Sequence, residues 1–442
     1  MGPTPAAVNA RGPQLPTRAD LVVIGAGICG CACAVEAARR GAAVLVVEKE
    51  GTVAPEGSGR SFGSLRVHGR HPAELPLAMS ALDLWARAAR DLEDDFEFVQ
   101  GGNLYVAERD DEVELLRTHL QHARDAGLED VRLLTPAQVR DLLPGWAGRI
   151  VAGLYSPRDA HCNPGKAVAA YARAAIRHGA VFAVRTRALG IEAINGAAEA
   201  VVTDRGAVRT RAVVVAAGVW TPALLAPLGV SIPIKTLIYS NAESSGVPPL
   251  FRATVRAASY SCRQRPDGKV VFGAGLNARV GHLVSLEDLR TLRLWLPRYW
   301  AYRQQVALRV DVRQVAREVR GALRGGAPQI PVGLEPVPDR MLLDRAFAAL
   351  QARIPPLADA AVTRRWAGFI DLSPDGLPVV DRVRPDGVTL AAGLSGHGLA
   401  LGPALGTILA DLALEGHTRH EITAFRLARF TAGPVPLPRR LI

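Results

Sequence analysis

Lysine and aromatic residues are scarce in this sequence of 442 residues. Only 4 of the 53 basic residues are lysine, so 49 are arginine, and aromatic residues make up 5% of the chain. The formal net charge is +11, but the arginines are spread along the chain, with too few aromatic side chains among them to stack on bases. This distribution of the positive charge therefore argues against nucleic-acid binding. An anionic substrate or an acidic partner is still open. Such arginine-rich usage is typical of a GC-rich genome and suggests a bacterial source.

Cysteines are too few and too poorly placed for a disulfide framework. There are five, an odd number, and Cys29, Cys31 and Cys33 lie along one predicted helix, where they cannot bridge one another. We interpret these three as small packing residues, expect no metal site, and expect a reducing, cytoplasmic environment.

Long apolar runs are absent as well. No uncharged apolar stretch reaches about 18 residues, so we expect no transmembrane helix. Residues 1–18 are rich in Pro, Ala and Gly and contain no apolar run, which is not the pattern of a signal peptide. We expect them to form a disordered lead-in.

The chain is longer than the size at which one hydrophobic core stops growing, so two domains are expected. The first elements form a βαβ unit, with strands at Asp20–Ile24 and Ala43–Glu48 and a helix at Cys31–Arg40. This unit predicts a parallel pair of strands covered by a helix. Further helices are expected at Glu74–Leu92, Asp111–Ala126 and Lys166–His178, and further strands at Asn103–Ala107, Val151–Tyr155, Val181–Ile194, Glu199–Thr203 and Val213–Ala217.

The pattern changes after Pro233. Alternating strands at Lys235–Ser240, Ala257–Arg263 and Lys269–Gly273 are typical of an antiparallel sheet with one wet face. A buried-strand pattern returns at Val388–Gly393. The chain is therefore expected to leave a nucleotide domain, build a second domain, and return.

Residues 279–320 carry nine arginines against four acids, together with Trp295, Tyr299, Trp300 and Tyr302. We expect an amphipathic helix pair broken at Pro297. Four roles stay open: an elaborated surface of the second domain, a lid over the active site, a docking surface for a partner subunit, and, least favoured, membrane-surface attachment.

A dinucleotide motif occupies the first strand-to-helix turn. Gly25, Gly27 and Gly30 form GxGxxG between a strand and a helix, and Glu48 ends the following strand 18 residues after Gly30. The glycines permit a tight turn, close approach to a pyrophosphate and close helix packing, while the acid accepts hydrogen bonds from a ribose. The chain then enters a Gly/Ser/Arg loop at residues 57–66 instead of further βα units. That loop favours FAD over NAD, because it can lie along an extended cofactor.

Five ordered blocks resemble the FAD-dependent D-amino-acid oxidase (DAO) superfamily, which includes glycine and sarcosine oxidases. They are the loop segment 57–78, the turn and helix at 159–180 with its NP pair, the AAG-x-W segment at 213–234, the W-x-G…SPDG-x-P block at 364–381, and the SGHG segment at 391–416. The resemblance spans almost the whole chain from Asp20 to about Phe425. It implies an α/β (α+β) fold, with a Rossmann-type FAD-binding domain assembled from discontinuous segments and a substrate domain whose antiparallel sheet covers the flavin.

The resemblance also implies domain boundaries and cofactor contacts. The FAD-binding domain is expected at residues 19–100, 155–234 and 364–435, and the substrate domain at 101–154 and 235–363. Non-covalent FAD is expected, because covalently flavinylated relatives place a cysteine where Gly368 stands. The expected cofactor-binding residues are Gly25, Ala26, Gly27, Ile28, Gly30, Glu48, Lys49, Arg60, Ser61, Gly63, Ser64, Ala188, Ala217, Gly218, Trp220, Gly393, Ser395, Gly396, His397, Gly398, Leu399 and Ala400.

Catalytic candidates are harder to place, because two substrate-binding arginines of glycine oxidases are missing here, at Ile370 and near Gly396. Tyr260 resembles the substrate-contacting tyrosine of those enzymes. Arg66 is our candidate to replace the missing arginines, and His397 is expected to contact flavin or substrate. Lys235 or Lys269 could promote oxygen reactivity, but the sequence selects neither.

The predicted function is FAD-dependent oxidation of the C–N bond of a small amine or amino acid, by hydride transfer to flavin N5 and hydrolysis of the resulting imine. The SGHG-x-x-LGP form resembles the catalytic subunits of opine oxidase, hydrogen cyanide synthase and D-hydroxyproline dehydrogenase, so a partner subunit or an electron acceptor protein is open. The alternative is a flavin-binding subunit with an assembly or electron-relay role. A monooxygenase using NAD(P)H is disfavoured, because a second GxGxxG is lacking.

Overall fold

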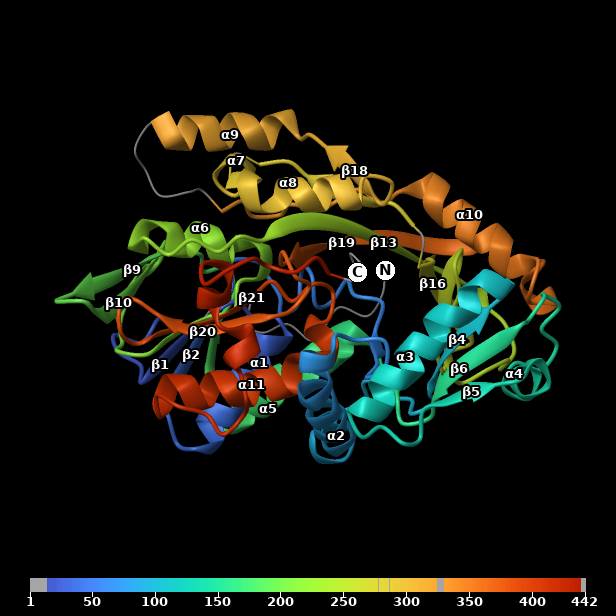
Figure 1. Ribbon diagram of the computed structural model, residues 1–442. Helices are drawn as coiled ribbons and strands as arrows, with labels where there is room; N and C mark the ends of the chain where they lie inside the picture. The colour runs from blue at the N-terminus through green and yellow to red at the C-terminus, as the bar shows by residue number, and fades with distance from the viewer. Residues whose placement is uncertain (1–13, 277, 286, 324–329, 439–442) are drawn as a thin grey trace.

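Two large sheets organise the chain. The computed structural model describes residues 14–438 except 277, 286 and 324–329. A six-stranded sheet covered by helices occupies one half of the molecule, and a ten-stranded sheet occupies the other (Figure 1). The mixed α/β architecture is the expected one.

The six-stranded sheet has the order β20-β21-β12-β1-β2-β8. All neighbours are parallel except the edge strand β20, which runs antiparallel to β21. Its central strands are short apolar runs buried on both faces, as expected for a parallel sheet between two layers. The strands are β1 (Leu21–Ile24), β2 (Val44–Val47), β8 (Val181–Ala183), β12 (Val213–Val215), β20 (Val379–Val383) and β21 (Val388–Ala392).

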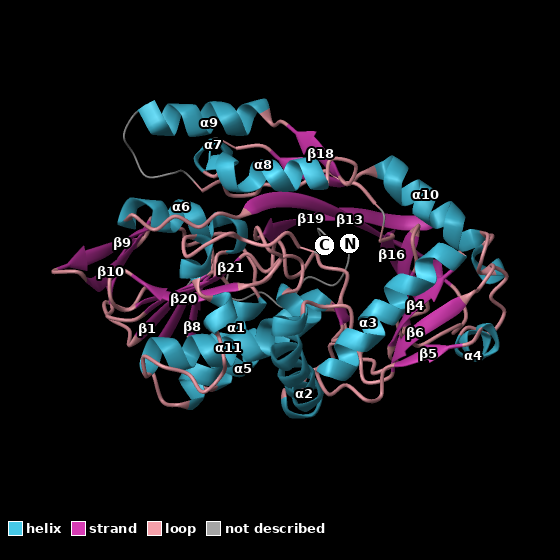
Figure 2. Cartoon of the chain, in the orientation of Figure 1, coloured by secondary structure: helices cyan, strands magenta, loops and turns pink. Residues whose placement is uncertain are grey.

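Helices cover one face of this sheet. α1 (Ile28–Arg39) lies between α5 (Pro164–Arg177) and α11 (Gly398–Leu414), and α2 (Leu75–Asp91) packs against α11 (Figure 2). The other face is covered by the three-stranded sheet β9 (Ala188–Ile194), β10 (Ala197–Thr203) and β11 (Gly206–Arg209) together with α6 (Thr221–Leu225).

The second sheet is mostly antiparallel, with the order β18-β17-β13-β16-β15-β14-β4-β6-β5 and with β19 added along β13. The long strand β13 (Lys235–Gly246) is the central strand of this sheet, because it pairs with β16, β17 and β19. The other strands are β4 (Asn103–Ala107), β5 (Arg132–Leu134), β6 (Ala152–Ser156), β14 (Thr254–Arg256), β15 (Tyr260–Gln264), β16 (Lys269–Ala274), β17 (Val280–Leu283), β18 (Val306–Arg309) and β19 (Val362–Leu372).

Helices α4 (Pro136–Leu142) and α10 (Arg340–Gln351) cover the outer face of this sheet, whereas α3 (Val113–Asp125) packs on the other face, against Tyr105 and Leu154. A two-stranded ribbon, β3 (Ser64–Leu65) with β7 (Ala160–His161), lies between the halves. The pairing supports the proposed two-domain division, which stays a proposal. β19 crosses the proposed boundary at residue 364, because it pairs with β13 along most of its length.

The arginine-rich segment differs from its expected form. It contains β17, α7 (Glu287–Arg290), α8 (Leu292–Ala301), β18 and α9 (Val312–Leu323), stacked above β13 in Figure 1. Pro297 lies inside α8 and does not break it. The expected helix pair is therefore corrected to two strands and three helices, in the order β17, α7, α8, β18, α9.

Three boundaries are corrected as well. The expected strand Val181–Ile194 is two strands, because Arg185 has a positive φ between them. The expected strand Ala257–Arg263 contains the turn between β14 and β15. Residues 1–13 of the expected lead-in lie outside the described residues, whereas Arg18 pairs with Arg209 of β11. No helix within the described ranges has the length and apolarity needed to span a bilayer.

Candidate functional site

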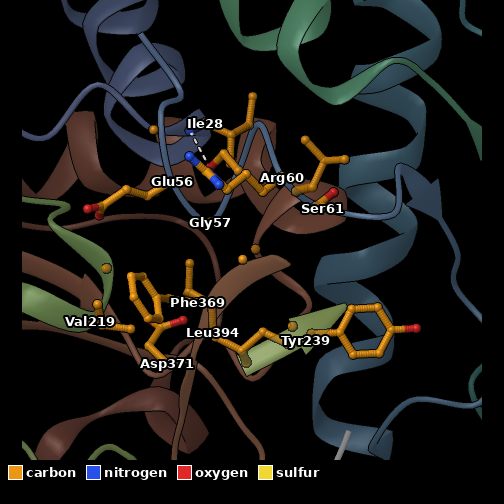
Figure 3. A pocket seen from close by; sticks show the side chains of 18 of the residues that line it. Ile28, Glu56, Gly57, Arg60, Ser61, Val219, Tyr239, Phe369, Asp371 and Leu394 are labelled. Carbon is orange, nitrogen blue, oxygen red and sulfur yellow. Dashed lines mark hydrogen bonds between the residues drawn. The ribbon is translucent and has the colours of Figure 1, made fainter. Parts of the chain in front are cut away.

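One cavity joins the two halves. It is lined by the carboxyl ends of β1, β2 and β12, by the loop 54–66, by strands β13 to β16 and β19, and by the start of α11. Figure 3 shows Glu56, Gly57, Arg60 and Ser61 along one wall, with Phe369, Asp371, Leu394 and Tyr239 opposite. Ligands of open parallel sheets bind beyond the carboxyl ends of the strands, so this is where the glycine turn is expected to act.

The glycine turn is built for close approach. Gly25 has a φ of +105°, and a Cβ on it would lie 2.5 Å from the carbonyl oxygen of Ala216. A Cβ on Gly30 would lie 2.0 Å from the carbonyl oxygen of Gly25. Any side chain at either position would push the start of α1 away from β1 and β12. The turn thus presents the N-terminal amides of α1 to the cavity, an arrangement that binds phosphate.

Glu48 fixes the turn from below. Its carboxylate is buried and accepts hydrogen bonds from the backbone N–H groups of Ala26 and Glu50, each at 2.9 Å. Burial raises its pKa, and the two backbone donors oppose that shift. Glu48 also lines the cavity. The side chain can therefore hold the turn and meet a ribose hydroxyl with its remaining acceptor capacity.

The 54–66 loop closes over the turn. Ser58 Oγ accepts a hydrogen bond from the N–H of Ile28 at 3.1 Å, shown as the dashed line in Figure 3. Arg60 donates to the carbonyl oxygens of Pro55 and Ala367, so it ties the loop to β19. Ser58 was not among the expected site residues. The Gly/Ser pattern of the loop could have pointed to it.

A second cluster borders the cavity beside Glu48. Trp220 donates its indole N–H to Glu56 at 2.8 Å, and Glu56 forms an ion pair with Lys49 at 2.7 Å. The ammonium of Lys49 lies 5.5 Å from the centre of the Trp220 ring. Lys49 and Trp220, both expected cofactor-binding residues, therefore line the cavity in one cluster with Glu56.

Most expected cofactor-binding residues line this cavity. The set spans six separate parts of the chain, which the fold brings together. These residues are Gly25, Gly27, Ile28, Glu48, Lys49, Arg60, Ser61, Gly63, Ser64, Ala188, Ala217, Gly218, Trp220, Gly396, His397, Gly398 and Leu399.

Five expected residues do not line it. The N–H of Ala26 is bound to Glu48, and Gly30 packs beneath the turn. Gly393 and Ser395 shape the turn before α11, where Ser395 Oγ donates to the carbonyl oxygen of Gly393. Ala400 accepts the indole N–H of Trp85. These residues support the wall and do not face the cavity.

A chain of charged side chains leads from a buried carboxylate to the cavity. Glu74 is fully buried, forms an ion pair with Arg70 at 2.5 Å, and contacts Nδ1 of His397 at 2.9 Å. A carboxylate only accepts, so Nδ1 of His397 carries the hydrogen and Nε2 is left as an acceptor. Nη2 of Arg66 lies 3.4 Å from this Nε2. His397, Arg66 and Arg70 line the cavity, whereas Glu74 lies behind them.

The charge states in this chain follow from burial and neighbours. Burial lowers the pKa of His397 to about 4, although Glu74 opposes the shift. Burial raises the pKa of Glu74, but His397 and Arg70 outweigh burial and hold it at about 2. At neutral pH the imidazole is therefore neutral and the carboxylate is ionised.

Tyr260 is corrected by the structure, because it does not reach the cavity. It is fully buried on the opposite face of the second sheet, where its hydroxyl donates to Glu108 at 2.7 Å and its ring packs against Trp146. Its neighbour Ser261 lines the cavity instead, because successive side chains of a strand point to opposite faces.

Tyr239, Arg256 and Asp371 are among the cavity residues that sequence reasoning missed. Burial raises the pKa of Asp371 to about 6, and its Oδ2 has no hydrogen-bond partner among the described residues. Lys235 and Lys269 lie away from the cavity and pair with Asp288 and Glu243. The alternation of polar and apolar residues along β13 and β19 separates the two faces of each strand. It does not indicate which face lines the cavity.

Replacing Tyr260 by Phe tests whether this side chain lies outside the substrate site. The variant loses one hydrogen bond to a charged acceptor, so its unfolding free energy should fall by about 1 to 2 kcal/mol in urea denaturation. Ligand binding and turnover should stay within about twofold of the wild type. A tenfold loss of turnover at unchanged stability would restore Tyr260 as a substrate contact.

The His397 imidazole should make stability depend on pH. Its folded pKa of about 4 lies below the ordinary value of 6.5, so between these values the unfolded chain binds more protons and stability falls as pH falls. The effect is at most about 3 kcal/mol. Thermal unfolding of His397→Gln should show a shallower decline from pH 6.5 to 4, while the exposed His417→Gln control should follow the wild type. Parallel curves for all three proteins would contradict the assignment.

Comparison with known proteins agrees with this geometry. The family model described as FAD dependent oxidoreductase (DAO) matches residues 20–412. The chain is 25% identical to sarcosine oxidase subunit beta of Rhizobium meliloti (strain 1021), over 94% of this chain and 89% of that protein. It is also 25% identical to glycine oxidase of Geobacillus kaustophilus, over 93% and 97%.

A solved structure of L-amino acid deaminase from Proteus myxofaciens superimposes with a TM-score of 0.87 at 21% identity, covering 96% of each chain. This likeness shows the fold. The glycine turn, the acid beneath it and the cavity fit an extended dinucleotide, as the family requires. The chain belongs to the DAO family of FAD-dependent oxidoreductases, and FAD is its cofactor.

Proposed function

We propose that this protein oxidises the C–N bond of a small amine or amino acid. The observation that carries the proposal is the continuity of the cavity, which runs from the Gly25–Ile28 turn to the wall formed by β13, β14 and β15. A dinucleotide anchored at the turn and extended along the cavity would bring its redox ring to that wall, beside Arg66, Tyr239 and Arg256.

The sequence relatives support the reaction class. Sarcosine oxidase subunit beta, glycine oxidase and monomeric sarcosine oxidase of Streptomyces avermitilis are all named for small amino acids, and all match over at least 93% of this chain. These relatives differ among themselves in the substrate they are named for. The proposal at this level is therefore a class of substrates, which includes both amines and amino acids.

The chain's own residues would hold the cofactor. The amides at the start of α1 would meet the pyrophosphate, and Glu48 the ribose hydroxyls. The amides of Gly396, Gly398 and Leu399, at the positive end of α11, would face the pyrimidine edge. Gly368 offers no nucleophile, so we propose non-covalent binding. When bound, FAD would accept the hydride, which carries two electrons, from the substrate carbon.

The remaining protein task is to orient the substrate and control its protons. The substrate loses a hydride and a proton to give an imine, which water then hydrolyses to a carbonyl compound and an amine or ammonia. His397 stays neutral at pH 7 because burial, Arg70 and Arg66 disfavour its charge and so keep its pKa low. It is therefore a hydrogen-bond acceptor that faces Arg66 on the cavity wall, and not a source of protons.

A partner subunit is a further part of the proposal. The match to a protein named as a beta subunit supports it. So do the exposed side chains of Leu292, Leu296 and Trp300 on α8, the last 74% exposed. The SGHG-x-x-LGP resemblance to opine oxidase and related catalytic subunits points the same way, but the placement in that subgroup stays a prediction. The cytoplasmic location also stays a prediction.

Anaerobic mixing of the FAD-loaded protein with a panel of amines and amino acids tests the reaction class. At least one compound should bleach the flavin absorbance near 450 nm with no partner protein present, since the chain carries its own substrate wall. Bleaching by NADH alone, with no response to any amine, would favour a monooxygenase. Bleaching only after a partner subunit is added would favour the relay role.

Glu48→Gln tests the anchor. The amide keeps the shape but replaces a charged acceptor, so FAD affinity should fall by about tenfold to a hundredfold. Equilibrium dialysis against FAD measures this, with Glu415→Gln as a control, because Glu415 pairs with Arg40 far from the cavity. Unchanged FAD affinity in Glu48→Gln would remove the carboxylate from the cofactor site.

A further inference from the structure

Arg256 stands on the cavity wall of the second sheet. It ends β14, and its partners in register are Tyr105 on the parallel strand β4 and Ser261 on the antiparallel strand β15. Side chains in register lie on the same face of a sheet, and Arg256 and Ser261 both line the cavity. The next residues along the strands, Val255 and Cys262, belong to the core behind the sheet. The fold therefore directs Arg256 toward the cavity.

Its guanidinium has no hydrogen-bond acceptor among the described residues. Nε is out of contact with solvent and has no partner, and no carboxylate of the described residues lies within ion-pair distance. The nearby carboxylate of Asp159 already accepts from the N–H of Val67 and from Nδ1 of His68. Burial lowers the pKa of Arg256, and the charge of Arg66 lowers it further, against opposing effects of Tyr105, Tyr239 and Asp159.

Other buried arginines of the same region are satisfied. Arg263, on the neighbouring strand, donates to the carbonyl oxygen of Phe62 at 2.6 Å. Arg70, which also lines the cavity, pairs with Glu74. A guanidinium remains charged at neutral pH and carries five donors. A partly buried charge without an acceptor is costly, and such groups cluster where a ligand supplies the missing partner.

Aromatic rings hold the guanidinium in place. Its central carbon lies 5.9 Å from the centre of the Phe62 ring and 6.0 Å from that of Tyr105. Contact with ring faces is a cation–π interaction, which stabilises the charge without using the N–H groups. The N–H donors are thus left for a planar anion, and a carboxylate fits them in a two-point contact.

Arg66 is less suited to this task than the sequence suggested. Its Nη1 donates to the carbonyl oxygens of His68 and Gly69 at 2.8 and 3.0 Å, and its Nη2 faces Nε2 of His397. His397 is the residue before α11, whose N-terminus we assign to the flavin edge. Arg66 is therefore held beside the cofactor end of the site, while Arg256 donates to no acceptor of the described chain.

We propose that Arg256 is the anion anchor of the substrate subsite and binds the carboxylate of an amino-acid substrate. It would replace the arginines that are missing at Ile370 and near Gly396. This inference rests on the proposed function for the identity of the substrate, but binding of an anion at Arg256 does not. The substrates are then amino acids, with a primary or secondary amine, and not amines without a carboxylate.

The first experiment measures anion binding without turnover. Benzoate and acetate are titrated into the FAD-loaded protein, and flavin absorbance and thermal unfolding are followed for the wild type, Arg256→Met, Arg256→Lys and the matched control Arg263→Met. The wild type and the control should bind at least one of the two anions. Arg256→Met should lose at least tenfold in affinity, and Arg256→Lys should keep part of it.

Thermal stability separates anchoring from a structural role. Without anion, Arg256→Met should unfold at the same temperature as the wild type or higher, because an unpaired charge has been removed. Arg263→Met should unfold at a lower temperature, because a satisfied hydrogen bond is lost. A wild type that binds neither anion, or an Arg256→Met variant that binds them like the wild type, would overturn the proposal.

The second experiment compares amino acids that bleach the flavin with their decarboxylated amines. Arg256→Met should lose at least a hundredfold in kcat/KM for the amino acids, mainly through KM, and should change little for the amines. If no compound bleaches the flavin but anion binding depends on Arg256, the proposed function fails and the anchor stands. If amino acids bleach the variant like the wild type, the function stands and the anchor fails.

Discussion

The site depends on how closely the start of α1 approaches β1 and β12. Two glycines permit that approach, since a Cβ at Gly25 or Gly30 would overlap a backbone carbonyl. Glu48 then locks the turn through the N–H of Ala26, and Ser58 caps the N–H of Ile28 from the opposite side. The same contacts that hold the helix also orient its free amides, so the packing of the six-stranded sheet and the binding of an anion are one arrangement.

The second sheet completes the site by a different physical route. Successive side chains of its strands point to opposite faces. Those on one face line the cavity, and those on the other form a separate core around Phe272 and Leu343. The 54–66 loop joins the two halves, because Arg60 binds the carbonyl of Ala367 while Trp366 and Asn241 donate to the carbonyl of Arg60. Movement of this loop would disturb the glycine turn and the substrate wall together.

Local patterns and long-range pairing differ in what they reveal. Strand, glycines, helix and acid lie within 30 residues, and each has a physical meaning on its own, so the roles of Gly25 and Glu48 follow from the sequence. The substrate wall does not follow in this way. Tyr260 faces away from the cavity because the turn at 257–259 falls inside the expected strand, and a shift of one residue exchanges the two faces of a strand.

Long-range contacts could not be predicted from the sequence either. Glu74 and His397 are 323 residues apart, and the sequence around either residue does not indicate that it contacts the other. The unsatisfied state of Arg256 is likewise a property of the folded chain alone, since it is defined by the acceptors around it.

The charged side chains around the cavity differ in whether another residue compensates them. Arg70 is compensated by Glu74, and this pair keeps His397 oriented without giving it a proton. Arg66 and Arg256 have no carboxylate partner among the described residues, so the wall presents uncompensated positive charge to the cavity. Oxidation of an amino acid brings one negative charge with the substrate and leaves another on the reduced ring system. In the proposed reaction, Arg256 would lie beside the substrate carboxylate and Arg66 beside the reduced ring system. An amine without a carboxylate would leave the partly buried Arg256 unmatched throughout that reaction.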